Sequence, residues 1–175
     1  MSTVSSPYGL KPVSLIGGQS FTGGTIREYL MTTNNTAPIF TGDLVQLGAA
    51  VAGQPTVVTA TPTTSSVGIV GVCVGVRYQL AGQQLGYPLY AQYLPANAIT
   101  SGFTNVFIRV MDDPDALFKV AVTSAGTSTI SGVTRAAVGQ NTALVITAGS
   151  TTTGDSYSSV SATTRSEEHT SELQS

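Results

Sequence analysis

Three of the nine acidic residues of this 175-residue chain lie in the segment MDDPDALFKV, where Asp112, Asp113 and Asp115 (the Asp112 cluster) surround a proline. Carboxylates this close together can supply oxygen ligands to calcium, although the segment lacks the interleaved glycine and closing glutamate of a recognised calcium loop. Pro114 after an aspartate is also typical of a β-turn, because the ring presets φ and the carboxylate accepts hydrogen bonds from nearby amides. We predict a turn and no resident metal, with a cation site at these three aspartates as the alternative.

Hydrolysis by paired carboxylates would require Asp43 to meet the Asp112 cluster in one cleft, since the two acids of such a site lie a few ångströms apart. The sequence leaves this arrangement open. Other catalytic sets are incomplete, because the chain has one histidine, His169, no G-x-S-x-G elbow and no Cys/His metal set. The stretch LIGGQSFTGGTIREY also lacks the patterns of phosphate-binding loops. We predict that the chain is not an enzyme and binds no cofactor, with a carboxylate hydrolase as the less favoured alternative.

A cluster of tyrosines in GYPLYAQYLPAN gives a candidate interface formed by Tyr87, Tyr90 and Tyr93. Pleating of a strand here places Tyr90 on the face opposite Tyr87 and Tyr93. One side of the strand would then present an aromatic ring to a partner, as interface anchors often do. The alternative is that Tyr90 lies at the rim of a sheet with its hydroxyl in water.

The clearest strand that could position such residues is VGIVGVCVGVRYQ, in which valine recurs at every second position from Val70 to Val76. Alternation places these valines and Tyr78 on one face, which we predict to be core. The opposite face is thin, with two glycines and Cys73, so we expect another backbone to approach it closely or the strand to bend there. We predict Cys73 to be a small buried residue, because the chain before residue 165 has no histidine to activate a thiolate.

Similar runs, rich in β-branched and aromatic residues, recur along the chain between Gly, Pro, Asn and Asp. Their spacing of about ten residues is typical of an all-β protein, an antiparallel sandwich or barrel. The segment TRAAVG, residues 134–139, predicts at most one short helical turn. Beyond Val122 the chain is dominated by Ser, Thr, Gly and Ala, which we expect to form weak edge strands and long loops. The expected strands are 25–33, 43–51, 56–60, 67–79, 87–93, 103–111, 117–123 and 142–148.

The end of the chain, RSEEHTSELQS (residues 165–175), differs abruptly in composition from the rest and holds the only histidine. It resembles the in-frame translation of a sequencing-library adapter, and a genuine acidic tail is the alternative. We therefore expect residues 1–164 to form a single β-rich domain that lacks its natural C-terminal end, and residues 165–175 to be a non-native tail.

Composition excludes several classes of function. Without Arg165 the basic residues fall from 7 to 6, and without Glu167, Glu168 and Glu172 the acidic residues fall from 9 to 6. A neutral chain with so few bases cannot neutralise many phosphates, so we expect no nucleic-acid partner. The longest apolar run is about half the length that crosses a bilayer, so we expect no membrane partner. With 41% hydrophobic and 9% charged residues, the chain is predicted to fold and to work inside an assembly.

Three segments together carry a resemblance to a known group of proteins. They are PYGLKPVSLIGGQSFTGGTIREYLMTTNNTAPIFTGDLVQL, GIVGVCVGVRY and MDDPDALFKV. Their order and content resemble small virion structural proteins of tailed phages, common in marine metagenomes and similar to capsid decoration or cement proteins. Leu44 departs from the pattern, since such proteins often have proline after the Gly-Asp pair, and the closing strands expected beyond Thr164 are absent.

The resemblance implies a non-enzymatic structural protein of the virion, assembled in the bacterial host cytoplasm. Its implied partners are the major capsid protein lattice and copies of itself, bound through neutral surface that is mostly apolar and hydroxyl-rich. A tail-fibre or glycan-binding β module is the alternative, in which Tyr87, Tyr90 and Tyr93 would be stacking platforms for sugars.

Overall fold

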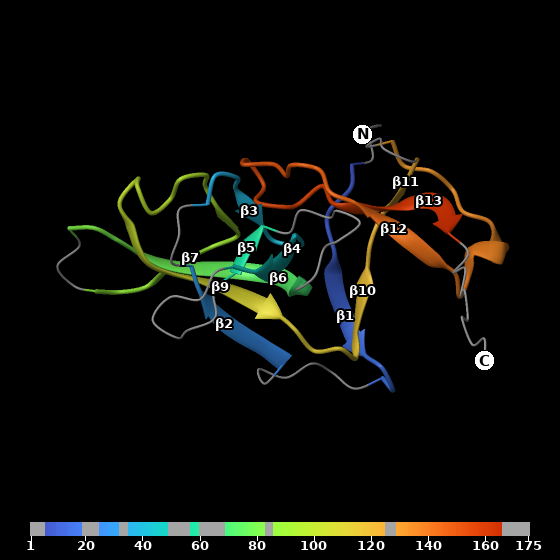
Figure 1. Cartoon of the computed structure of the whole chain (residues 1–175), viewed down its shortest axis with the longest axis horizontal. Helices are drawn as coiled ribbons and strands as arrows, with labels where there is room; N and C mark the ends of the chain where they lie inside the picture. The colour runs from blue at the N-terminus through green and yellow to red at the C-terminus, as the bar shows by residue number, and fades with distance from the viewer. Residues whose placement is uncertain are drawn as a thin grey trace, which may run out of the picture.

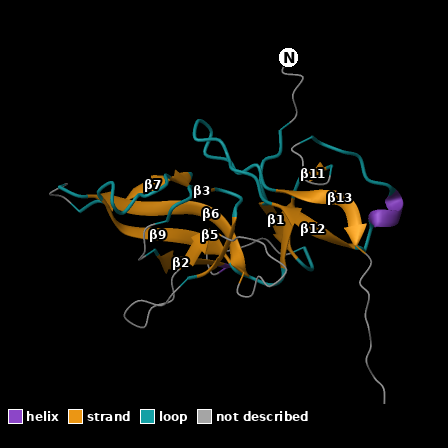
Figure 2. Cartoon of the chain, turned by 45° about the horizontal axis from the view of Figure 1, so that its top comes forward, coloured by secondary structure: helices purple, strands orange, loops and turns teal. Residues whose placement is uncertain are grey.

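Strands make up nearly all regular structure in the described part of the chain (Figures 1 and 2). The computed structural model describes residues 6–18, 25–31, 35–48, 57–59, 69–82, 86–124 and 129–165. One short 3-10 helix, η2 (Arg135–Ala137), accompanies the strands. The strands are β1 (Lys11–Leu15), β2 (Ile26–Leu30), β3 (Ile39–Phe40), β4 (Leu44–Leu47), β5 (Val57–Thr59), β6 (Ile69–Leu80), β7 (Leu89–Ala91), β8 (Tyr93–Leu94), β9 (Phe103–Met111), β10 (Ala116–Lys119), β11 (Val122–Thr123), β12 (Asn141–Val145) and β13 (Ser159–Arg165).

The all-β class predicted from the sequence is confirmed. Every segment expected to form a strand overlaps at least one, and β9 has the predicted bounds. The helix η2 lies within the segment 134–139 that predicts a helical turn. Some of the predicted features lie outside the described residues. These are parts of the expected strands (32–33, 49–51, 56, 60 and 67–68), two glycines of the glycine-rich stretch (23–24) and most of the predicted tail (166–175).

The largest sheet has six strands, in the order β2-β9-β6-β4-β5 with β7 also paired to β6. All of its pairings are antiparallel. A two-stranded ribbon, β1–β10, lies between this sheet and a three-stranded sheet of order β11-β13-β12 (Figure 1). The short strands β3 and β8 pair with each other. The largest sheet curls, so its concave side can enclose a core.

Two apolar clusters hold these sheets together. The larger cluster is built mainly on the six-stranded sheet and includes Ile39 and Ile108, both fully buried. The smaller cluster includes Val72 of the six-stranded sheet, and both Phe118 of the ribbon and Leu144 of the three-stranded sheet pack against it. The three sheets therefore share apolar contacts, and burial of each large side chain contributes about 1.5–3 kcal/mol before entropy is counted.

The sequence does not predict β1, β3 or β13. Strand β1 contains Pro12, which removes a backbone donor and usually indicates an edge strand. It does occupy such a place, in the two-stranded ribbon, with a register shift between Pro12 and Ser14. Strand β3 has only two residues, too few for a periodic pattern.

Strand β13 corrects the expectation of weak edge strands in the Ser- and Thr-rich region, because it is the middle strand of its sheet. It pairs with β12 in the antiparallel sense and with β11 in the parallel sense. Polar groups of β13 form hydrogen bonds with the neighbouring strands. The buried hydroxyls of Ser159 and of Thr123 in β11 lie 2.8 Å apart, and Thr142 Oγ1 in β12 donates to the carbonyl of Ser161 at 2.6 Å. Hydrogen bonding lets small polar residues take the place of apolar ones.

Strand β6 does not alternate as predicted. Its register against β9 shifts between Cys73 and Gly75, which makes Val74 a bulged residue. Cys73 and Val76 consequently both belong to the larger core, whereas Val74 lines a hollow at the surface. The prediction that Val74 is a core residue is therefore wrong, because strict two-residue periodicity does not survive a bulge.

The close backbone approach expected on the thin side of β6 is confirmed at Gly71. A Cβ atom there would lie 2.9 Å from the carbonyl carbon of Met111 in β9, and closer still to its oxygen. Both atoms belong to the backbone of the central strand pair, so neither can move without disturbing the sheet.

Replacing Gly71 with alanine should lower the free energy of unfolding by about 1–3 kcal/mol, because the added methyl group overpacks the β6–β9 pair. Urea denaturation measures the change. Gly132→Ala is the matched control, since a Cβ at Gly132 meets nothing within 4 Å, and it should stay within about 0.5 kcal/mol of the parent. Equal stability of the two variants would contradict the close approach.

Candidate functional site

Asp43, an acid of the possible hydrolytic pair, is buried in the turn between β3 and β4 and is 5% exposed. One carboxylate oxygen accepts a hydrogen bond from the amide of Phe40 at 2.8 Å. The other accepts bonds from the hydroxyls of Ser158, at 3.2 Å, and Ser156. One buried carboxylate thus joins the β3–β4 turn to a segment more than a hundred residues later, which supports a structural role.

The same turn, residues 40–43, forms backbone hydrogen bonds with several segments that are distant in sequence. We call this turn the Gly42 corner. Gly42 adopts a φ of +93°, which favours glycine, and a Cβ atom on it would lie 3.0 Å from Cα of Gly9. Close packing therefore requires glycine at position 42. The corner's backbone hydrogen bonds are Leu10 N to Gly42 O (3.0 Å), Gly42 N to Cys73 O (2.8 Å), Thr41 N to Gln92 O (2.9 Å) and Ser156 N to Thr41 O (3.0 Å).

The protonation of Asp43 reflects a balance between burial and hydrogen bonding. Burial raises the pKa of Asp43 above its ordinary value of 3.8, because the charged form loses its hydration. The bonds from Ser156, Phe40 and Ser158 act in the opposite direction and are the smaller effects. The native fold consequently binds a proton at Asp43 more tightly than the unfolded chain does.

The aspartates of the Asp112 cluster take separate roles around a turn. Asp113 Oδ1 accepts a hydrogen bond from the amide of Asp115 at 2.9 Å, as the turn prediction requires. Asp112 Oδ2 instead accepts a bond from the Tyr29 hydroxyl at 2.7 Å and lies 3.3 Å from Arg27. Burial first, and then the bond to Asp112, raise the pKa of Tyr29. The turn is confirmed.

The hydrogen bonds of Asp43 and Asp112 form two networks that have no residue in common. Each carboxylate is occupied by partners of its own, so this arrangement gives no support to a catalytic pair. Among the residues that the structure describes, no group of three or more His, Cys, Asp or Glu side chains is placed to hold a metal ion.

Cys73 is fully buried in the larger core, as predicted. Its sulfur lies 3.7 Å from the carbonyl oxygen of Gly75. Burial raises the pKa of the thiol to about 12, and the nearby Asp43 carboxylate adds to the shift. A thiol with this pKa is not a nucleophile at neutral pH.

The three tyrosines of the candidate interface have different environments. Tyr87 and Tyr90 are 68% and 65% exposed, so both rings are accessible to a partner. Tyr93 stacks on Phe40, with ring centroids 5.5 Å apart, and so packs within the fold. The interface role stays a prediction for Tyr87 and Tyr90, and Tyr93 contributes to the packing beside the Gly42 corner.

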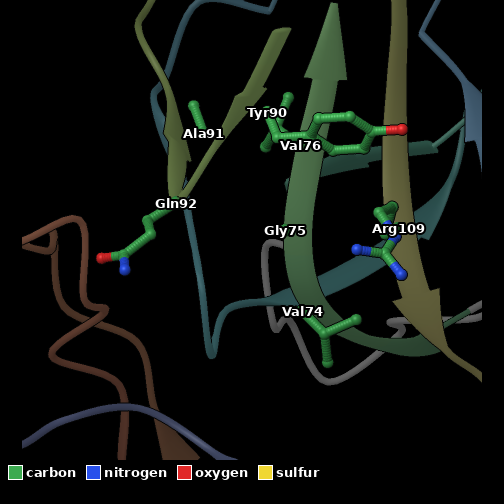
Figure 3. Close-up of a pocket in the computed structure, with 7 residues that line it drawn as sticks. All are labelled: Val74, Gly75, Val76, Tyr90, Ala91, Gln92 and Arg109. Atoms are coloured by element: carbon green, nitrogen blue, oxygen red, sulfur yellow. The ribbon is translucent and has the colours of Figure 1, made fainter. Parts of the chain in front are cut away.

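Tyr90 borders a surface hollow of about 270 Å³ over β6, β7 and β9 (Figure 3). The Tyr90 ring extends across β6 towards β9, and the guanidinium of Arg109 turns towards Gly75 (Figure 3). The bulged Val74 lies at another edge of the same hollow. The hollow thus combines an aromatic ring, a cation and an aliphatic edge, which are features of small-ligand sites.

Of the two arginines near this hollow, Arg77 forms an ion pair and Arg109 does not, within the described residues. Glu28 is bound by Arg77, whose Nε and Nη2 atoms lie 3.1 and 2.6 Å from Glu28 Oε2. Arg77 also lies over the ring of Phe107, 4.3 Å from its centroid. Glu28 is directly opposite Arg109 in the β2–β9 pair, yet within the described residues no ion pair joins them. Arg109 therefore keeps its positive charge available at the hollow.

Sequence reasoning misses Arg109 and Val74 as residues of a site. Arg109 alternates with Ile108 and Val110, whose apolar character already places it on the outer face of its strand. This alternation identifies the face of the strand on which Arg109 lies, but not the side chains that lie next to Arg109. Val74 gives no signal, because the bulge that turns it outward arises from its pairing with β9.

A second exposed surface lies on the ribbon, where Val13, Ile16 and Leu117 are 58%, 61% and 46% exposed. We call these three residues the ribbon surface. Leu117 is paired with Ser14, adjacent to Val13, while Phe118 packs into the smaller core. The ribbon therefore buries one face and leaves apolar side chains on the other.

Comparisons with protein-family models, with curated proteins and with solved structures find no match to this chain. Function is consequently argued from the sites themselves and from the chemistry of their residues.

The raised pKa of Asp43 predicts how the free energy of unfolding depends on pH. The native state prefers the protonated form, so the contribution of Asp43 is complete below pH 3.8 and declines as pH rises through the raised native pKa. Asp43→Asn, which cannot ionise, should lack this decline. Urea denaturation of both proteins across this pH range measures the difference, and a parent that gains stability relative to Asp43→Asn as pH rises would contradict the sign.

Burial of Cys73 predicts slow reaction of its thiol. Native protein at pH 8 should react with a thiol-specific disulfide reagent at least about a hundredfold more slowly than protein unfolded in urea, because the thiolate is scarce and enclosed. Absorbance of the released reagent measures both rates. Equal rates would show that Cys73 is accessible.

Proposed function

We propose that this chain is a non-enzymatic structural protein of a tailed-phage virion, of the capsid decoration or cement type. It attaches to the lattice of the major capsid protein and contacts copies of itself. The observation that carries the proposal is the apolar ribbon surface on a protein whose acidic residues mostly serve to hold its own fold. The resemblance of the three sequence segments supports the same class.

The ribbon surface suits attachment to a rigid lattice because it is carried by paired strands. Val13 belongs to β1 and Leu117 to β10, and Ile16 follows β1 with its amide bonded to the carbonyl of Asp115 at 2.8 Å. A stable contact needs about 1,000 Å² of buried surface, so the ribbon surface would form the centre of a larger patch. Many copies on one lattice would multiply modest individual affinities.

Two lysines, Lys11 and Lys119, lie opposite each other in the ribbon beside this surface, and we expect them to contribute less to the contact than the apolar side chains do. Lys11, beside the ribbon surface, is paired with Asp155 at 3.5 Å and lies 5.4 Å from the centroid of the Tyr8 ring. Apolar burial does not depend on screening by salt, whereas attraction between exposed charges does. No helix among the described residues has the length and apolar character to cross a membrane.

The test is the binding of purified protein to undecorated heads of the phage that encodes it, measured by co-sedimentation. Binding should be the same within about twofold at 50 mM and 500 mM NaCl, because few charges take part. The double variant Val13→Asp, Leu117→Asp should bind at least about tenfold more weakly, since it places two carboxylates in an apolar contact.

The matched control is Val138→Asp, which adds a carboxylate at a position that is 79% exposed and distant in sequence from the ribbon. It should bind like the parent. Free energies of unfolding within about 0.5 kcal/mol of the parent show that each variant is folded. Strong loss of binding with salt, or undiminished binding by the double variant, would refute this mode of attachment.

A further inference from the structure

We propose that the hollow between Tyr90 and Arg109 binds a sugar ring that carries a carboxylate, such as a uronic-acid residue of an acidic glycan. This site is separate from the ribbon surface, and the inference does not rest on attachment to a capsid. It depends on three features of the hollow: the guanidinium of Arg109, the aromatic ring of Tyr90 and the volume of the hollow.

The cation selects the charge of the ligand. Arg109 presents its guanidinium at the hollow, and the acid opposite it in the sheet, Glu28, is held by Arg77 through two nitrogen atoms. A guanidinium donates paired hydrogen bonds that match the geometry of a carboxylate. The Glu28–Arg77 pair therefore leaves Arg109 free to bind an anion from solution.

The aromatic ring and the aliphatic edge select the body of the ligand. Tyr90 is 65% exposed and crosses β6, so one face of its ring is open for stacking (Figure 3). Val74 and Ala91 add apolar contact, and Gly75 adds no side chain that would fill the space. A pyranose ring offers a face of C–H groups that packs on an aromatic ring, and its hydroxyls point outward from that face.

The small volume of the hollow favours a sugar over an aromatic acid as the ligand. Its volume of about 270 Å³ is below the range of about 300–1,000 Å³ found for sites that enclose drug-sized ligands, so one side of the bound ring stays in water. A sugar keeps hydrated hydroxyls on that side. An aromatic acid would leave an apolar face exposed, which forfeits part of the hydrophobic gain.

The test is a titration of the isolated chain with sodium glucuronate, followed by ¹H–¹⁵N and aromatic chemical shifts in 150 mM NaCl. The shifts should centre on Tyr90, Val74 and Arg109, with a dissociation constant of about 1 mM, a value in keeping with a ligand of this size. Glucose, acetate and benzoate are the comparison ligands. Each should bind at least about fivefold more weakly than glucuronate. Glucose lacks the carboxylate, acetate lacks the ring, and benzoate lacks the hydroxyls.

Two pairs of variants locate the site. Arg109→Gln should weaken glucuronate binding at least about tenfold, whereas Arg135→Gln makes the same charge change on η2 and should stay within about twofold. Tyr90→Ala should also weaken binding at least about fivefold, whereas Tyr87→Ala, at an equally exposed tyrosine, should not. Tyr90→Phe keeps the ring and should bind like the parent.

Several results would overturn the proposal. Equal binding of acetate would show an adventitious anion contact only, and equal binding of glucose would remove the role of Arg109. Tighter binding of benzoate would replace the sugar with an aromatic acid. Undiminished binding by Arg109→Gln or Tyr90→Ala would place the ligand elsewhere. Because the titration uses no capsid, its outcome is independent of the shell-binding result.

Discussion

One buried carboxylate fixes the positions of segments that the sequence separates by more than a hundred residues. Asp43 accepts hydrogen bonds from Phe40, Ser156 and Ser158, and the adjoining Gly42 packs against Gly9. Apolar contacts alone would leave the three-stranded sheet free to slide, since they have no direction. Hydrogen bonds to a single carboxylate are directional, so they set the register of the C-terminal segment against the six-stranded sheet.

Several ionisable side chains of the described residues are occupied within the fold. Asp43 and Cys73 are buried, and Asp112 and Glu28 are bound by arginines. Among the exposed features of the described residues are an apolar ribbon and a hollow with one arginine and one tyrosine. We propose that both surfaces serve adhesion, the ribbon to a protein lattice and the hollow to a small anionic sugar.

Local sequence patterns predict most strands, because period-two alternation and turn residues are local signals. They predict the turn at Asp113 for the same reason, whereas the burial of Cys73 is predicted from its small apolar side chain and from the absence of a histidine before residue 165. They fail at Val74, where a bulge reverses the side chain, and at β13, where Ser159 and Ser161 are buried through partners distant in sequence. The hollow is beyond such patterns, because Tyr90 and Arg109 meet only after β7 and β9 both pair with β6.

The central claim is that this protein acts by attachment as a component of a particle. Quantitative mass spectrometry of density-purified phage particles tests it most directly, by counting copies of this chain per copy of the major capsid protein. The account predicts a fixed ratio, with one copy for each repeated unit of the shell lattice, that survives washing in high salt. Absence of the chain from infectious particles, with the protein recovered only free in the lysate, would contradict it.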